Sequence, residues 1–300
     1  MKKKPEFVKW ILAGILFAAL WPSASTATKI GLTVAQPLVI AVVRFALASV
    51  IMLLIAHIIK GHRLPQGKEW KQLAVYALLN ITIYLGCYVI AMQTVTAGIG
   101  ALAIATNPVF ISFISVFFFN KRLTWNVAVA IFVCTAGVIV AAWPLFSEAV
   151  VDFKGLLILL FSMLSYSVGA VYFAEKNWGN LSLVVINGWQ TLLGGIFLLP
   201  FTLFFYHSNK NTFNFTFWAS VSWLAIPVSI IAVLIWLWLL KIDSIKAGLW
   251  LFLCPIFGFL FAALLLHDKI SFYTIAGVMM VLAGLLISHS FKRKEVIILD

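Results

Sequence analysis

Charged residues are scarce in this sequence. Of its 300 residues only 10% are Asp, Glu, Lys or Arg, whereas 64% are hydrophobic, and the mean hydropathy is +1.10. A soluble domain keeps about a quarter of its residues charged, because its surface must be solvated. The charges here are too few to cover a water-facing surface, so we expect the lipid bilayer as the surroundings of this protein.

Motifs for metals, phosphates and proteolysis are also lacking. The three cysteines, Cys87, Cys134 and Cys254, lie in apolar runs without CxxC spacing, which argues against a disulfide framework or a zinc site. Residues 61–69, GHRLPQGKE, have the wrong glycine spacing for a phosphate-binding loop, and no HExxH is present. We therefore expect no enzyme activity, no catalytic residue, no metal and no cofactor.

Long apolar runs fill the chain. A hydrocarbon core of about 30 Å needs roughly 20 apolar residues per helix. The sequence predicts ten such helices, at 7–28, 36–59, 70–92, 95–119, 123–142, 155–174, 181–206, 217–240, 244–266 and 271–290. The first run resembles a secretory signal peptide, but its removal would break the repeat described below, so we expect it to be retained.

The basic residues predict how these helices are oriented. With the N-terminus in the cytoplasm, 16 Lys and Arg residues fall in cytoplasmic segments and 4 on the opposite side, with Arg44 inside a span, which accounts for all 21. This bias fits the positive-inside rule and predicts a multi-pass protein of the cell (inner) membrane with both termini cytoplasmic. The net charge of +12 therefore reports orientation, and we expect no nucleic-acid partner.

The two halves of the chain resemble each other at a constant spacing of 147 residues. Residues 96–140 and 243–287 share a proline within one span, a tight polar connector and a glycine in the next span, and the matched pairs are Pro108 and Pro255, Leu123 and Ile270, and Gly137 and Gly284. Because each half would contain an odd number of spans, the second must insert upside down. The predicted fold class is an all-α integral membrane protein of ten transmembrane helices in two inverted five-helix repeats, 1–143 and 155–290, followed by a cytoplasmic tail, 291–300.

These features resemble the EamA-type, ten-helix branch of the drug/metabolite transporter superfamily over nearly the whole chain. The residues that carry the resemblance are Trp21, Pro37 and Arg44, Ala97-Gly98, Pro108, Lys121-Arg122-Leu123-Thr124 and Gly284. The sequence departs from the family at Lys121, where a Glu is usual, and the equivalent in the second half is Asp268. The resemblance implies a secondary transporter that exports amino acids or related metabolites by alternating access around a central cavity.

Polar and aromatic residues inside the predicted spans are the candidates for binding a small-molecule substrate, because such groups are costly in lipid unless they face a cavity or another helix. Asn80, Tyr84 and Tyr88 recur every four residues, on one helical face. The other candidates are Trp21, Ser25, Arg44, Asn107, Tyr166, Gln190 and Trp250. Each could instead form hydrogen bonds between helices, and Tyr88 could belong to the interfacial aromatic belt.

Arg44 lies well inside a span, where an arginine costs about 3 kcal/mol on insertion scales. It could meet a substrate carboxylate, extend outward toward the membrane surface, or pair with a helix C-terminus. None of the nine acidic residues lies in the middle of a span, so we expect transport without a mid-membrane carboxylate as proton relay.

Two further functions stay open at this point. One is export of multiple drugs or toxic compounds, and the other is a membrane-embedded assembly subunit that transports nothing. The sequence also leaves the oligomeric state open.

Overall fold

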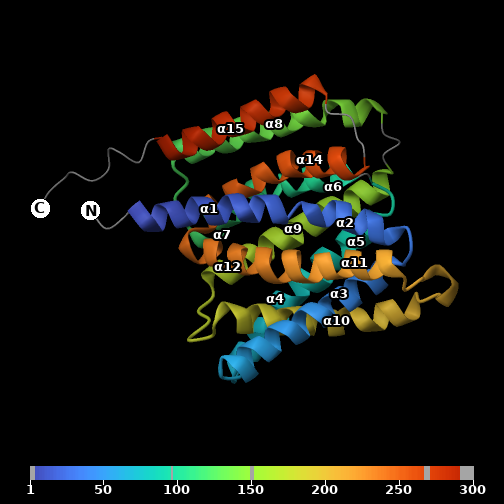
Figure 1. Cartoon of the computed structure of the whole chain (residues 1–300). Coiled ribbons are helices and arrows are strands. Elements are labelled where there is room, and N and C mark those ends of the chain that lie inside the picture. The colour runs from blue at the N-terminus through green and yellow to red at the C-terminus, as the bar shows by residue number, and fades with distance from the viewer. Residues whose placement is uncertain (1–3, 96, 149–151, 267–270, 291–300) are drawn as a thin grey trace, which may run out of the picture.

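The computed structural model describes residues 4–95, 97–148, 152–266 and 271–290, and within these ranges the secondary structure is entirely helical. In Figure 1 the helices lie side by side along one direction, and α1 begins on the same side of the bundle on which α15 ends. We call this side the inner end and the opposite side the outer end.

The first half of the chain forms eight α-helices and two π-helical segments. In chain order they are α1 Lys4–Leu20, α2 Ser23–Leu32, α3 Pro37–Leu53 with a π-helical end Leu54–Ile59, α4 Lys68–Ala77, a π-helical segment Leu78–Ile83, α5 Tyr84–Ala91, α6 Ala97–Ile104, α7 Asn107–Phe119 and α8 Trp125–Glu148.

The described part of the second half forms seven α-helices, one π-helical segment and two 3₁₀ turns. It contains α9 Phe153–Glu175, α10 Leu183–Phe204, a short 3₁₀ turn Ser208–Lys210, α11 Phe215–Trp223, a π-helical segment Leu224–Ala232, α12 Val233–Ile242, α13 Ser244–Leu249, a 3₁₀ turn Trp250–Leu253, α14 Cys254–Leu266 and α15 Phe272–Ser290.

Eight helical segments in the described ranges are long and apolar enough to cross a bilayer, and they correspond to the first four spans and the sixth to ninth spans predicted from the sequence. The first extends to Leu32, beyond the predicted end at residue 28, because the chain resumes its helix after Pro22. The fifth and tenth predicted spans contain shorter apolar helices, Trp125–Val140 and Ile275–Ile287. The all-helical membrane fold is confirmed, and the count of ten stays a prediction.

Several spans are broken rather than continuous, and proline explains most of the breaks. Pro22 lies in the turn between α1 and α2, Pro108 in the first turn of α7, and Pro255 in the first turn of α14. Proline lacks the N–H that a helix interior requires and disfavours helical geometry in the residue before it. The breaks leave backbone groups in the membrane without helical partners, which is tolerated where the backbone is buried in protein.

The breaks recur at the spacing found in the sequence. α6 begins at Ala97 and α13 at Ser244, and α7 begins at Asn107 and α14 at Cys254, so the members of each pair are 147 residues apart. The π-helical segments of the third and eighth spans also overlap at this spacing. These coincidences support the internal repeat.

Helices α8 and α15 pack along each other at one edge of the bundle, and glycines let them approach closely (Figure 1). A Cβ atom on Gly284 would lie 2.5 Å from the Sγ atom of Cys134, and one on Gly137 would lie 2.7 Å from the carbonyl oxygen of Gly277. Small residues at such contacts are typical of membrane helices, which associate by close packing. The Gly137 and Gly284 match seen in the sequence therefore has a packing role.

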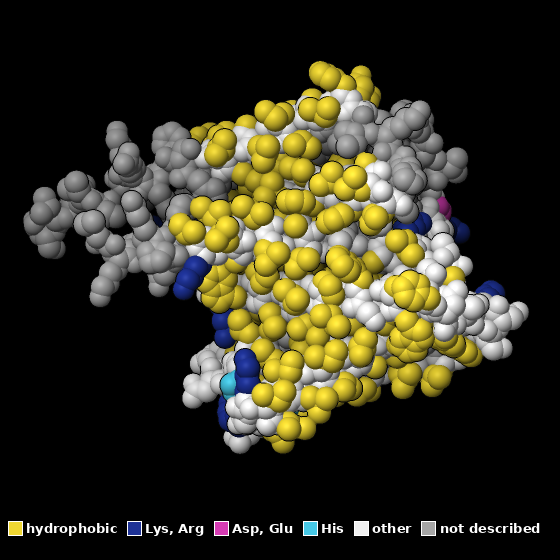
Figure 2. Space-filling view, viewed as in Figure 1, with side chains coloured by type: hydrophobic (Ala, Val, Ile, Leu, Met, Phe, Trp, Pro, Cys, Tyr) yellow, Lys and Arg dark blue, Asp and Glu magenta, His cyan; other side chains and the backbone are white. Residues whose placement is uncertain are grey.

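The surface agrees with a bilayer environment. Figure 2 shows hydrophobic side chains covering the middle of one face, with Lys and Arg side chains at its two ends. Exposed apolar residues on different helices include Leu12, Phe132 and Phe201.

Candidate functional site

The centre of the bundle contains a cluster of aromatic and hydroxyl side chains from the first, third and sixth spans. The ring centroids of Tyr84 and Tyr166 are 4.7 Å apart, and those of Trp21 and Tyr166 are 5.8 Å apart. The hydroxyl groups of Ser25 and Tyr88 share a hydrogen bond of 2.7 Å. The structure thus brings together five of the predicted site residues, which we call, with Arg44, the central cluster.

Arg44 on α3 lies beside this group and is buried, with 2% of its surface exposed, so it does not extend to the membrane surface. Its Nε–H donates to the Ser229 hydroxyl at 2.7 Å, and its guanidinium lies 5.5 Å from the ring centroid of Phe45. It is within electrostatic reach of the Tyr84 and Tyr88 hydroxyls. Among the residues that the structure describes, no carboxylate pairs with Arg44 and no acceptor receives its other N–H groups.

Two further residues, which the sequence did not single out, complete the aromatic group. Trp236 on α12 stacks on Phe17 with ring centroids 4.9 Å apart, and it lies 5.9 Å from the ring of Tyr166. Within the described ranges, neither the Tyr166 hydroxyl nor the Trp236 Nε1–H has a hydrogen-bond partner, although both are buried. A tryptophan in the middle of a span can be read from the sequence, but its contacts depend on how the spans pack.

Asn80 and Gln190 belong to a different arrangement, a chain of amides across three spans. The Asn80 amide donates to Gln190 Oε1 at 3.1 Å, and the Gln190 amide donates to Asn187 Oδ1 at 2.9 Å. The Asn187 amide in turn donates to the backbone carbonyl of Ser229 at 2.8 Å. These mutual bonds hold α10 to the π-helical segments on either side of it.

The expected common face of Asn80, Tyr84 and Tyr88 is interrupted. Asn80 lies in the π-helical segment Leu78–Ile83, whereas Tyr84 begins α5. A π-turn contains more residues per turn than an α-helix, so the four-residue spacing no longer keeps the side chains aligned. Asn80 consequently faces Gln190, while the two tyrosines remain in the central cluster.

Asn107 and Trp250 contact other parts of the bundle. The Ser167 hydroxyl donates to Asn107 Oδ1 at 3.1 Å, and the Asn107 amide lies 3.4 Å from the sulfur of Met163, so Asn107 joins α7 to α9. Trp250 packs against Trp10 on α1, with ring centroids 5.0 Å apart.

Comparison with known proteins places this arrangement in a family. The sequence profile of the EamA-like transporter family matches residues 8–143 and again residues 153–289. The chain belongs to the EamA-like transporter family. It is therefore a membrane transporter, and the resemblance drawn from its sequence is confirmed.

Relatives of this EamA-like chain match it over most of their length. An uncharacterized transporter of Archaeoglobus fulgidus is 26% identical over 92% of this chain and 95% of its own, and the uncharacterized transporter YoaV of Bacillus subtilis is 23% identical over 96% and 100%. Protein PecM of Dickeya dadantii is 25% identical over 92% of each chain. A solved crystal structure with 18% identity has a TM-score of 0.78 and covers 93% of this chain and 98% of its own, which shows the shared fold.

Lys121, at which we expect a departure from the family pattern, has a structural role. Lys121, at the inner end between α7 and α8, forms an ion pair with Glu175 at the end of α9. Its ammonium group also donates to the Ser244 hydroxyl at 3.2 Å. Both partners lie in the second half of the chain, so Lys121 joins the halves at the inner end. Asp268, its counterpart in the sequence of the second half, lies outside the described residues.

The amide chain and the central cluster should respond differently to substitution. We expect Gln190→Ala to lower the free energy of unfolding by about 1–3 kcal/mol, because it removes the acceptor of the Asn80 amide and leaves that donor buried without a partner. Tyr166→Phe removes a hydroxyl that has no partner among the described residues and should keep or raise stability. Thermal unfolding of the two purified variants in detergent measures the difference, and equal losses of stability would contradict it.

Proposed function

We propose that the protein is a secondary transporter that exports amino acids or related carboxylate-bearing metabolites by alternating access around the central cluster. The observation that supports this most is an excess of hydrogen-bond donors. The Tyr166 hydroxyl and the Trp236 Nε1–H are buried without a partner among the described residues, and Arg44 donates only its Nε–H within them, to Ser229. Such groups are costly when unpaired, and a ligand rich in oxygen acceptors would satisfy them.

A carboxylate fits the charge of the site as well as its donors. The guanidinium group of arginine binds carboxylates through paired hydrogen bonds, and Arg44 has no carboxylate partner of its own among the described residues. The rings of Trp21, Tyr84 and Tyr166 offer faces that can hold an apolar side chain or an ammonium group. A zwitterionic amino acid matches both requirements.

Cationic drugs match the site less well. The buried positive charge of Arg44 repels a cation, and in the described part of the chain no acid lies beside it to attract one. The excess of donors therefore favours metabolite export over export of multiple cationic drugs. An assembly subunit without transport would have no need for a buried, unpaired arginine.

Alternating access is supported by contacts between the halves at both ends. At the inner end Lys121 binds Glu175 and Ser244, and at the outer end the Asn211 amide of the second half donates to Gln36 Oε1 of the first at 2.9 Å. The rings of the central cluster touch one another, so a solute can enter only when helices separate. Opening one set of contacts while the other stays closed would expose the cluster to one side at a time.

The membrane and orientation follow from charge. We propose the cell (inner) membrane, with the inner end in the cytoplasm, because most Lys and Arg residues fall in segments at that end. The halves 1–143 and 155–290 would then be inverted five-helix repeats, as the recurring breaks at a spacing of 147 residues favour.

The class of ligand can be tested by binding. In a thermal-shift screen of the purified chain, we expect L-leucine, L-phenylalanine or 4-methylpentanoate to raise the melting temperature more than the matching amides. Arg44→Gln should weaken binding of the carboxylate by roughly 10- to 100-fold, the equivalent of a hydrogen bond to a charged group. Isothermal titration calorimetry measures this ratio.

The amide-chain variant Gln190→Ala is the matched control for that experiment. It should lower the melting temperature but keep the carboxylate-dependent shift, since Gln190 bonds to Asn80 and Asn187 rather than to Arg44. Stabilisation by amides equal to that by carboxylates, or an unchanged affinity in folded Arg44→Gln, would refute the proposed site.

The second prediction tests the contact at the inner end. Lys121→Glu places a second carboxylate beside Glu175 and replaces attraction by repulsion. We expect this variant to slow transport of the solute identified in the thermal-shift screen, measured in proteoliposomes, by roughly two- to fivefold, because a partly exposed ion pair contributes little energy. The exchanged pair Lys121→Glu with Glu175→Lys restores attraction and should recover the rate. Failure of the double variant to recover, with folding intact, would argue against a gating role.

The third prediction concerns orientation. A green fluorescent protein fused after residue 300 should fluoresce in cells, and alkaline phosphatase fused at the same place should be inactive, because that end lies in the cytoplasm. Phosphatase activity from this fusion would reverse the assignment.

A further inference from the structure

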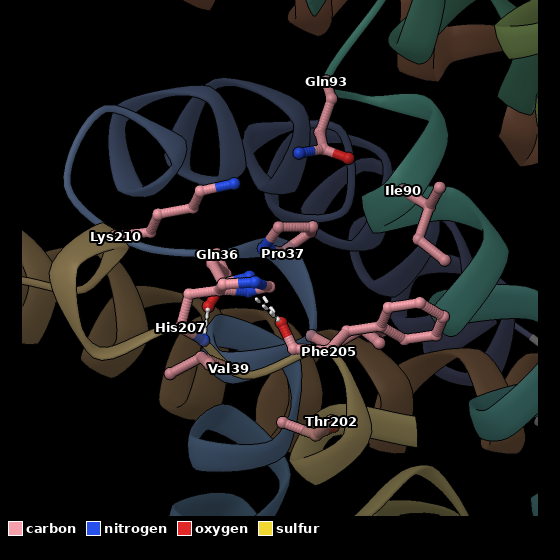
Figure 3. Close-up of a pocket in the computed structure, with 10 residues that line it drawn as sticks. Gln36, Pro37, Val39, Ile90, Gln93, Thr202, Phe205, His207 and Lys210 are labelled. Atoms are coloured by element: carbon pink, nitrogen blue, oxygen red, sulfur yellow. Dashed lines mark hydrogen bonds between the residues drawn. The ribbon is translucent and has the colours of Figure 1, made fainter.

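A separate cavity of about 350 Å³ opens at the outer end, outside the central cluster. It lies between the first turns of α3, the ends of α5 and α10, and the loop that follows α10. Figure 3 shows its lining, to which Pro37, Ile90, Gln93, Phe205, His207 and Lys210 contribute. We call this cavity the outer vestibule.

The polar groups of the outer vestibule converge on its interior. In Figure 3 the ammonium group of Lys210 and the amide of Gln93 extend toward the same space, and Ile90 and Phe205 form an apolar wall beside it. In the part of the chain that the structure describes, neither the Lys210 ammonium group nor the Gln93 side chain has a hydrogen-bond or ion-pair partner. One cation and one amide beside an apolar wall suit a carboxylate attached to an apolar body.

The surroundings strengthen the positive potential. Lys29 lines an adjoining cavity of about 320 Å³, and Gln93 lines both cavities. No acid contributes to the described lining of either. Asp152, which is also at the outer end, caps α9 by accepting hydrogen bonds from the backbone N–H groups of Lys154 and Gly155. A concave site whose described charged groups are all cations raises the local concentration of anions.

The wall that carries His207 and Lys210 is held in place. Gln36 accepts hydrogen bonds from the His207 backbone N–H at 2.8 Å and donates to the Phe205 carbonyl at 2.8 Å. The Thr212 backbone N–H donates to the Val34 carbonyl at 2.8 Å. The loop after α10 is thus fixed to the loop before α3, so the vestibule is formed before any ligand arrives.

The vestibule lies on the way to the central cluster. Pro37 precedes Arg44 by seven residues on α3, which is about 10 Å at 1.5 Å per residue. On the neighbouring α5, Ile90 follows Tyr88 by two residues. A solute leaving Arg44 toward the outer end would therefore pass along the same two helices into the vestibule.

We propose that the outer vestibule is a second binding site for the carboxylate-bearing solute, with Lys210 and Gln93 as its anion-binding groups. The ligand class rests on the proposed function, but the site is distinct from Arg44. It would hold the solute at the outer end of the pathway, after the solute leaves the central cluster and before it is released.

The test uses the full-length protein in detergent and 4-methylpentanoate as the probe. In an Arg44→Gln background, where the central site is weakened, calorimetry should still show weak binding. Adding Lys210→Gln should weaken this residual binding at least about tenfold. Adding Lys154→Gln instead, an exposed lysine at the outer end that does not line the cavity, should leave it unchanged.

Each result separates the two proposals. Equal binding by the Lys210→Gln and Lys154→Gln double variants, or no residual binding in Arg44→Gln, overturns the vestibule site. Full binding in Arg44→Gln that is lost with Lys210→Gln overturns the central site and supports the vestibule. Monodisperse elution of every variant in size-exclusion chromatography excludes misfolding as the cause of a loss.

Discussion

The constraint on which this structure depends is that a polar group in the hydrocarbon core must find its partner within the protein. It makes every described element of the chain helical, because a helix satisfies its own backbone. It also explains why Asn80, Asn187 and Gln190 bond to one another and to the backbone rather than standing alone. Departures from the constraint are therefore informative, and two of those within the described ranges, the Tyr166 hydroxyl and the Trp236 Nε1–H, lie together in the aromatic group at the centre.

The breaks show how the same constraint acts on the backbone. Pro22, Pro108 and Pro255 each interrupt a span, and the chain resumes its helix within a few residues. The breaks after α6 and before α14 share the spacing of 147 residues, so both halves interrupt a helix at the equivalent position. A broken helix places two helix ends in the middle of the bundle, and this suits the alternating access that we propose.

Much of the fold could be predicted from the sequence, because hydrophobic length and charge bias are local properties. The ends of the helical span Pro37–Ile59 and of α10, for example, fall within a few residues of the predicted spans. The site was harder to predict, because it depends on geometry that composition does not show. The π-helical segment before Tyr84 turns Asn80 away from the tyrosines, and no proline marks that segment in the sequence. Trp236 joined the cluster through the packing of α12 on α1, which only the three-dimensional arrangement reveals.

The contrast between satisfied and unsatisfied donors separates stability from function within one bundle. The amides of Asn80 and Gln190 are paired and hold the helices together, so they contribute to stability. Tyr166 and Trp236 are equally buried but keep donors without acceptors among the described residues, and the buried Arg44 uses only its Nε–H there, which costs stability. A protein that needed these positions only for packing would be more stable with apolar residues there. Groups that are unfavourable for the closed bundle are retained most readily where a bound solute offsets their cost, which is the physical basis for proposing the transport site at Arg44.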